Sequence, residues 1–174
     1  MLIETSINYD TSFIFDLDWA DYKDDSTAYH ALRQKDLHAP WGGLPNTYNE
    51  HNTAIYQRFF SKDEIDFDEL GKQLNIEAHS ISAIKQEPGN IIPLHSDTFY
   101  KVKQSAPDDV RPAVRANIFL EDWMLGHVIQ FNNSMVTDWE KHTGFIFDGS
   151  VPHLSANCGM QSKYTLQISG FLNG

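Results

Sequence analysis

The chain has 174 residues, of which 41% are hydrophobic, including eleven Phe, seven Tyr and four Trp. This size and composition predict a single globular domain over residues 1–174 and argue against a disordered protein. The formal net charge of -11 repels phosphate backbones, so generic nucleic-acid binding is not expected. The first residues lack the features of a signal peptide and no window is apolar enough for a membrane span, so no membrane association is expected. The single cysteine, Cys158, cannot form an internal disulfide, which favours a reducing, cytoplasmic location.

The N-terminal part predicts a mixture of short elements. Residues 2–19 have the pattern of one or two strands, and residues 26–35 predict a short helix. Ser61 and Glu64 form a capping-box pattern, and the apolar residues that follow predict a helix over residues 62–74. We expect residues 1–75 to support the rest of the domain and to supply a possible lid.

From residue 76 onward the chain consists of short β-like segments separated by turn residues. The predicted strands are His79–Gln86, Ile91–Leu94, Phe99–Lys103, Ala113–Leu120, His127–Phe131, Gly144–Phe147, Val151–Ala156 and Lys163–Phe171. Short strands at this spacing predict a mainly β fold with flanking helices, a double-sheet jelly roll whose core spans residues 76–174.

Two of the predicted strands place polar side chains on one face. Lys163 and Thr165 share a face of the last strand, and His153 and Ser155 share a face of the strand before it. Such a face points either to water or to a functional site.

A possible metal site begins with His95 and Asp97, which lie two residues apart and point to the same side of an extended segment. A metal can bridge two such side chains, and His153 is the best candidate for a third ligand. Two imidazoles and one carboxylate form the triad that suits Fe(II), because they leave coordination positions open for oxygen and a cosubstrate.

The order His95-x-Asp97, then His153, then Lys163 ten residues later resembles the Fe(II)/2-oxoglutarate-dependent oxygenases, in particular their prolyl 4-hydroxylase-like branch. The resemblance covers roughly residues 80–172 and implies a double-stranded β-helix, which is a form of jelly roll. It implies that His95, Asp97 and His153 bind Fe(II). It also implies hydroxylation of an unactivated C–H bond with O2 and 2-oxoglutarate, releasing succinate and CO2.

The same resemblance implies three residues for the cosubstrate. Lys163 matches the basic residue that binds the distal carboxylate of 2-oxoglutarate. The hydroxyl of Thr165 faces the same way and could share that carboxylate, and Tyr100 is expected to reach the same cosubstrate.

Candidate substrate residues lie in two places. Arg115 and Asn117 share one face of a predicted strand, where they either line the cleft or, for Arg115, form an internal salt bridge. Trp41 lies in a Gly/Pro-rich loop of the kind that often covers a site. These residues suit a small polar molecule or a peptide side chain with a carboxylate or amide. The oligomeric state is left open.

Two alternatives remain. His153 and Asn157 match the end of the second cupin motif, which would make the protein a cupin-type metal enzyme that does not use 2-oxoglutarate. However, Asp97 replaces the second histidine of the first cupin motif, and no Glu follows within the expected distance. The other alternative is a non-catalytic jelly-roll binding module, in which the histidines and Asp97 only form hydrogen bonds.

Overall fold

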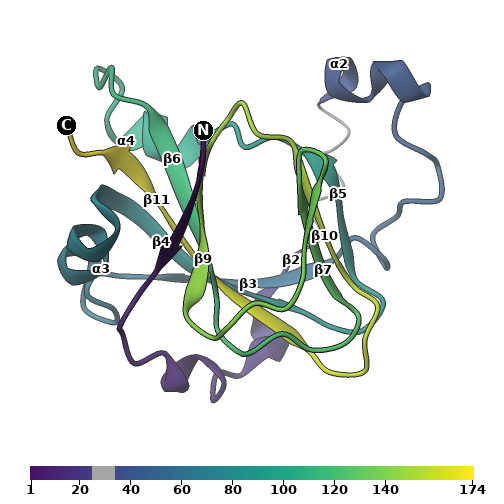
Figure 1. Ribbon diagram of the computed structural model, residues 1–174, viewed down its shortest axis with the longest axis horizontal. Coiled ribbons are helices and arrows are strands. Elements are labelled where there is room, and N and C mark those ends of the chain that lie inside the picture. Colours follow the sequence, from purple (N-terminus) through teal and green to yellow (C-terminus); the bar gives the residue numbers. More distant parts are fainter. Residues whose placement is uncertain (25–33) are drawn as a thin grey trace.

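A computed structural model describes residues 1–24 and 34–174 and shows two antiparallel β-sheets that face each other (Figure 1). The larger sheet has the order β1 (Leu2–Ser6), β9 (Thr143–Asp148), β6 (Ala113–Phe119), β11 (Lys163–Leu172), β4 (Ile76–Gln86), β3 (Ile55–Phe60), β2 (Lys23–Asp24). The smaller sheet has the order β5 (Ile91–His95), β10 (His153–Asn157), β7 (His127–Phe131), β8 (Ser134–Val136). The predicted jelly-roll fold is confirmed.

One predicted strand is wrong. The segment Phe99–Lys103 belongs instead to helix α4 (Tyr100–Ser105), which Phe99 precedes with a left-handed φ of 54°. Phe99 and Val102 are both buried, whereas Lys101 between them is exposed. This spacing of three residues suits a helix, because a strand would place Phe99 and Val102 on opposite faces.

The predicted N-terminal elements differ in their bounds from the observed ones. Residues 2–19 contain only one strand, β1, followed by the 3-10 segments η1 (Ser12–Ile14) and η2 (Trp19–Tyr22). Residues 26–33 of the predicted helix lie outside the described residues, and α2 (Lys35–His38) and η3 (Ala39–Trp41) follow.

The helix expected over residues 62–74 is the shorter α3 (Phe67–Leu74). Asp66, rather than Ser61, is its N-cap, since Asp66 Oδ1 accepts hydrogen bonds from the backbone N–H groups of Asp68 and Glu69. Ser61 and Glu64 do hydrogen-bond to each other, but they close a turn ahead of the helix.

The larger sheet separates two apolar clusters. On its outer face, Ile81, Ile118 and Leu166 pack with Leu70 of α3, which lies outside the barrel in Figure 1. Between the two sheets lies a second cluster made largely of aromatic residues: Phe119, Ile129, Phe131, Trp139, Phe147 and Val151. Alternation along each strand therefore directs one set of side chains outward and the other into the barrel.

The inner face of β11 is polar but buried. Lys163, Thr165 and Ser169 are exposed by only 1%, 7% and 5%, respectively. The polar face noted in the sequence therefore points into the barrel and not to water.

Candidate active site

Two histidines and one aspartate meet inside the barrel. His95 is the last residue of β5 and His153 is the first of β10, and the antiparallel register pairs them directly. Asp97 follows just beyond the end of β5, with its Oδ1 3.9 Å from His95 Nε2. One ligand atom from each residue lies within 4.8 Å of the others. The structure thus brings the three predicted ligands together in a cluster that could hold a metal ion.

The backbone orients both imidazole rings in the same way. Nδ1 of His95 lies 2.8 Å from the carbonyl oxygen of Pro93, and Nδ1 of His153 lies 3.0 Å from that of Val151. Because a carbonyl oxygen only accepts hydrogen bonds, these contacts assign the proton to Nδ1 in each ring. Both Nε2 atoms therefore keep the lone pair that a metal requires.

Burial also keeps the two rings neutral. The pKa of His95 is lowered to about 4, mainly by burial and to a smaller extent by the neighbouring His153. Burial likewise lowers the pKa of His153, against the opposite effect of Asp97. Because histidine must be unprotonated to bind a metal, two neutral imidazoles with a carboxylate fit a divalent transition metal such as Fe(II).

Side chains from other elements hold the aspartate, which has no strand to position it. The Gln34 amide forms two hydrogen bonds with the backbone of Ser96, the residue before Asp97. It accepts from the Ser96 N–H at 2.8 Å and donates to the Ser96 carbonyl oxygen at 2.5 Å. Arg115 donates from Nη1 to Asp97 Oδ1 at 3.0 Å and from Nε to Ser169 Oγ at 3.0 Å. Arg115 therefore makes an internal ion pair, one of the two roles that its position in the sequence allowed.

The ammonium group of Lys163 is enclosed in the same barrel. Its Nζ donates to the carbonyl oxygen of Val128 at 2.7 Å, to Ser155 Oγ at 2.5 Å and, more weakly, to Gln86 Oε1 at 3.4 Å. Burial lowers the pKa of Lys163 to about 7, and the negative charge of Glu121 opposes this shift. A buried ammonium of this kind gains strongly from an anionic partner.

The lysine lies close to the histidines along β10. Ser155, which contacts Lys163, is two residues beyond His153 on the same face of the strand. Such positions are separated by about 6–7 Å. Thr165 is buried on the same face of β11 as Lys163. The metal cluster and Lys163 therefore both lie inside the barrel, between the two sheets.

The other predicted site residues are in different environments. Asn117 is buried on the inner face of β6, and its Oδ1 has no hydrogen-bond partner within the described residues. Tyr100, which we expect to reach the cosubstrate, is the first residue of α4 and is 69% exposed.

The segment that carries Trp41 lies on the outer side of β5. His38 Nε2 bonds the carbonyl oxygen of Leu94 at 2.7 Å, and a cleft of about 170 Å³ is lined by His38, Trp41, Gly43, Leu44, Pro45, Tyr48 and Leu94. Leu94 precedes His95, so alternation directs the two side chains to opposite sides of the strand. Trp41 is 70% exposed. The segment borders β5 rather than closing over the metal cluster.

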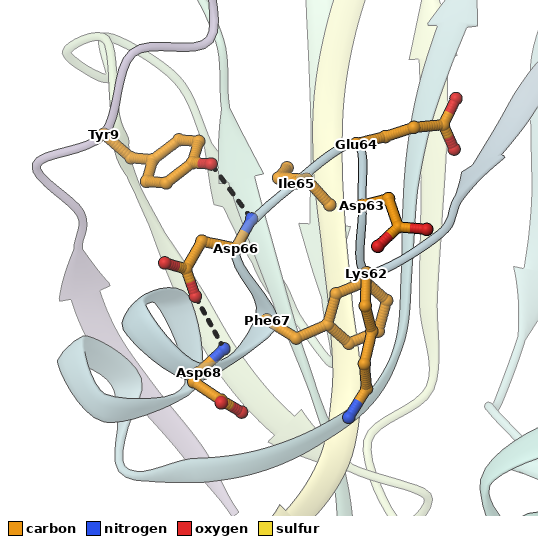
Figure 2. Close-up of a pocket in the computed structure, with 8 residues that line it drawn as sticks. All are labelled: Tyr9, Lys62, Asp63, Glu64, Ile65, Asp66, Phe67 and Asp68. Carbon is orange, nitrogen blue, oxygen red and sulfur yellow. Dashed lines mark hydrogen bonds between the residues drawn. The ribbon is translucent and has the colours of Figure 1, made fainter.

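A larger depression of about 410 Å³ lies elsewhere, around the start of α3 (Figure 2). Its polar groups serve the helix: Asp66 caps α3, and the Tyr9 hydroxyl accepts from the backbone N–H of Asp66 at 3.0 Å. Because α3 packs on the outer face of the larger sheet, this depression is separate from the barrel interior.

Two prolyl hydroxylases are similar in structure to this chain. A Pseudomonas putida prolyl-4-hydroxylase has a TM-score of 0.55 and 15% sequence identity, covering 99% of this chain and 92% of that one. The viral collagen prolyl hydroxylase of Paramecium bursaria Chlorella virus-1, in its 2OG complex, has a TM-score of 0.51 and 15% identity, covering 69% and 80%. A predicted oxalate decarboxylase from Thermotoga maritima has a TM-score of 0.44 and 16% identity, covering 68% and 82%.

At 15% identity the two prolyl hydroxylases show that this chain shares their jelly-roll fold, and they show no more than the fold. No protein-family model and no curated protein sequence matches the chain. Among the residues that the structure describes, no helix is both long and apolar enough to cross a membrane.

Proposed function

We propose that the protein is an Fe(II)- and 2-oxoglutarate-dependent dioxygenase that hydroxylates an unactivated C–H bond. The observation that carries this proposal is that a buried ammonium group lies close to the metal cluster. Lys163 contacts Ser155, which is two residues beyond the cluster residue His153 on β10. A five-carbon diacid with a keto group beside one carboxylate can chelate a metal at that end and reach Lys163 with the other. The shared fold with a prolyl hydroxylase in its 2OG complex supports the same reading.

Each residue has a defined part in this reaction. His95, Asp97 and His153 would hold the iron, which when bound supplies the redox chemistry for the use of O2. Lys163 and Thr165 would hold the distal carboxylate. One oxygen atom of O2 goes to the carboxylate of succinate as CO2 is lost from 2-oxoglutarate, and the other becomes the hydroxyl of the product.

Aromatic side chains pack against the metal cluster inside the barrel and limit its contact with water. The rings of Phe131 and Phe147 lie 5.7 and 4.7 Å from the ring of His153, measured between centroids. A dry interior strengthens the attraction between Lys163 and an anion, and it restricts side reactions with solvent.

For the substrate we propose a small polar molecule or a peptide side chain. Asn117 Oδ1 is a buried acceptor that lacks a partner in the described part of the chain, so it suits a substrate N–H or O–H group. Trp41 lies outside the barrel and could contact only a substrate that extends beyond it, as a peptide does. Arg115 is engaged by Asp97, so it serves the metal cluster rather than the substrate.

The buried lysine also weighs against the two alternatives. A cupin-type metal enzyme without 2-oxoglutarate, or a module that binds no metal, would still carry the cost of desolvating Lys163 without an anion to bind there. Both alternatives make different experimental predictions from the dioxygenase.

The proposal is tested by adding Fe(II) to the protein under anaerobic conditions and then supplying O2 and 2-oxoglutarate. We expect about one Fe(II) per chain and the release of succinate, measured across a panel of amino acids, peptides and nucleosides. His95→Ala, Asp97→Ala and His153→Ala should abolish succinate release, whereas His51→Ala, at an exposed histidine, should not. Iron binding without succinate under any condition would favour the cupin alternative. No metal binding at all would favour the binding module.

A further inference from the structure

A second nitrogen donor is buried beside Lys163. Gln86 is the last residue of β4 and pairs with Lys163 across the sheet. It is only 3% exposed, and its Nε2 has no hydrogen-bond partner within the described ranges. Buried polar atoms almost always have a partner, so a ligand group is one explanation for a donor left without one.

The chemistry of its neighbours fixes which end of the Gln86 amide faces Lys163. Gln86 Oε1 accepts from Ser155 Oγ at 2.6 Å and lies 3.4 Å from Lys163 Nζ. A rotated amide would direct its NH2 group at the ammonium, and both groups can only donate. The oxygen must therefore face Lys163, and the unpartnered nitrogen lies on the other side of the amide.

We propose that Gln86 Nε2 and Lys163 Nζ together bind the distal carboxylate of the cosubstrate. Gln86 Nε2 would donate to one oxygen, and the Lys163 N–H group that now makes the long 3.4 Å contact with Gln86 Oε1 would donate to the other. This inference deepens the proposed function and rests on it. A carboxylate accepts at two oxygens and donates at none, so it suits two neighbouring N–H donors better than an amide or a hydroxyl would. Gln86 would thus be a specificity-determining residue beside Lys163.

The test measures the binding of 2-oxoglutarate by calorimetry, without oxygen and with Mn(II) in place of iron. Gln86→Met removes the amide, and we expect about ten- to hundredfold weaker binding, the range for a hydrogen bond to a charged group. Gln86→Glu keeps an oxygen for Ser155 and Lys163 but replaces the donor with a second acceptor, so binding should fall further. Glutarate lacks the keto group that chelates the metal. Each Gln86 substitution should weaken the binding of glutarate by the same factor as it weakens the binding of 2-oxoglutarate.

The matched control is Gln57→Met on the neighbouring strand β3, because Gln57 Nε2 already donates to Ser82 Oγ at 3.0 Å. Its affinity for 2-oxoglutarate should stay within twofold of the wild type. Thermal unfolding and Mn(II) affinity of each variant check that the fold and the metal cluster are intact, and Gln86→Glu decides the question if Gln86→Met does not fold.

Three results would overturn the inference. If the Gln86 variants bind 2-oxoglutarate as tightly as the wild type, the carboxylate does not use Gln86, and the proposed function still stands. If only 2-oxoglutarate and not glutarate loses affinity, the effect comes from the metal end. If the wild type binds no 2-oxoglutarate, the proposed function itself fails, and this inference fails with it.

Discussion

Arg115 donates a hydrogen bond to Asp97 across 3.0 Å, so the carboxylate of the metal cluster already has a cationic partner without a metal. The Asp97 side chain is 8% exposed and that of Arg115 is 21% exposed. Removing one partner of a buried ion pair leaves an uncompensated charge, which typically costs several kcal/mol. The ion pair therefore contributes to the stability of the metal-free protein as well as to the position of Asp97.

We expect Arg115→Met to destabilise the metal-free protein by about 2–4 kcal/mol in urea unfolding. Saturating Mn(II) should recover part of this loss, because the metal replaces the missing positive charge. Arg111→Met is the control, since Arg111 pairs with Glu77 and Asp109 at the surface, where solvent screens the charges, so its loss should destabilise the protein far less. An equal loss with and without Mn(II) would separate Arg115 from the metal cluster.

The backbone around Asp97 provides a second prediction. A Cβ atom on Gly149 would lie 2.8 Å from the carbonyl oxygen of Asp97 and 3.6 Å from the ring of Phe99. Gly149→Ala should therefore displace the Asp97 segment and weaken Mn(II) binding about tenfold, equivalent to about 1.4 kcal/mol, as measured by titration. Gly174→Ala, where nothing lies within 4 Å, should leave Mn(II) binding unchanged. Unchanged binding in Gly149→Ala would mean that Asp97 can shift without cost to the metal.

Strand alternation explains how much of the fold could be predicted from the sequence. The bounds of β7, His127–Phe131, agree with the prediction because β-branched and aromatic residues lie there between the turn residues Gly126 and Asn132. Strand β3, Ile55–Phe60, was missed because its polar Gln57 and Arg58 are adjacent, which breaks the alternation. The segment after Asp97 was predicted as a strand because its composition is β-like, while its spacing of buried residues is helical.

The order of residues along the chain suggested the metal cluster, but it did not reveal the partners that surround it. Alternation on β6 placed Arg115 on the inner face, yet its contact with Asp97 depends on how the segment after β5 packs against β6. Gln86 was also missed, because an ordinary glutamine at the end of a strand carries no signal in the sequence. Only the pairing of β4 with β11 brings it beside Lys163.

A third prediction concerns Glu121, whose Oε1 accepts a hydrogen bond from the backbone N–H of Tyr164. Burial raises the pKa of Glu121 from 4.5 to about 7. Between these two pH values the folded protein retains a proton that the unfolded chain has lost, so the free energy of unfolding falls as the pH rises. Glu121→Gln removes this effect, and we expect the variant to be more stable than the wild type at pH 8 and similar to it at pH 4.

The gain should be modest, about 1 kcal/mol, because solvent screens a carboxylate that is only partly buried. Urea unfolding of both proteins at pH 4, 6 and 8 measures it, and Glu140→Gln, at an exposed glutamate, should show no such trend. A stabilisation of the same size at pH 4 and pH 8 would show that ionisation of Glu121 is not its cause.

The last prediction is a pH dependence of cosubstrate binding that follows from Lys163. Its pKa is lowered to about 7, chiefly by burial, so the free protein loses the ammonium charge as the pH rises above 7. A carboxylate binds the ammonium and not the neutral amine, so binding of 2-oxoglutarate must then take up a proton. We expect the affinity for 2-oxoglutarate to fall above pH 7, by at most about tenfold for each pH unit.

Calorimetry at pH 6, 7, 8 and 9 with Mn(II) present measures this fall. Repeating the titrations in buffers of different ionisation enthalpy counts the protons taken up, which should approach one per 2-oxoglutarate above pH 8. Lys163→Arg is the control, because arginine stays protonated throughout this range and should bind with little pH dependence. If the wild type and Lys163→Arg show the same pH profile, the titrating group is not Lys163, and the carboxylate is held by another cation.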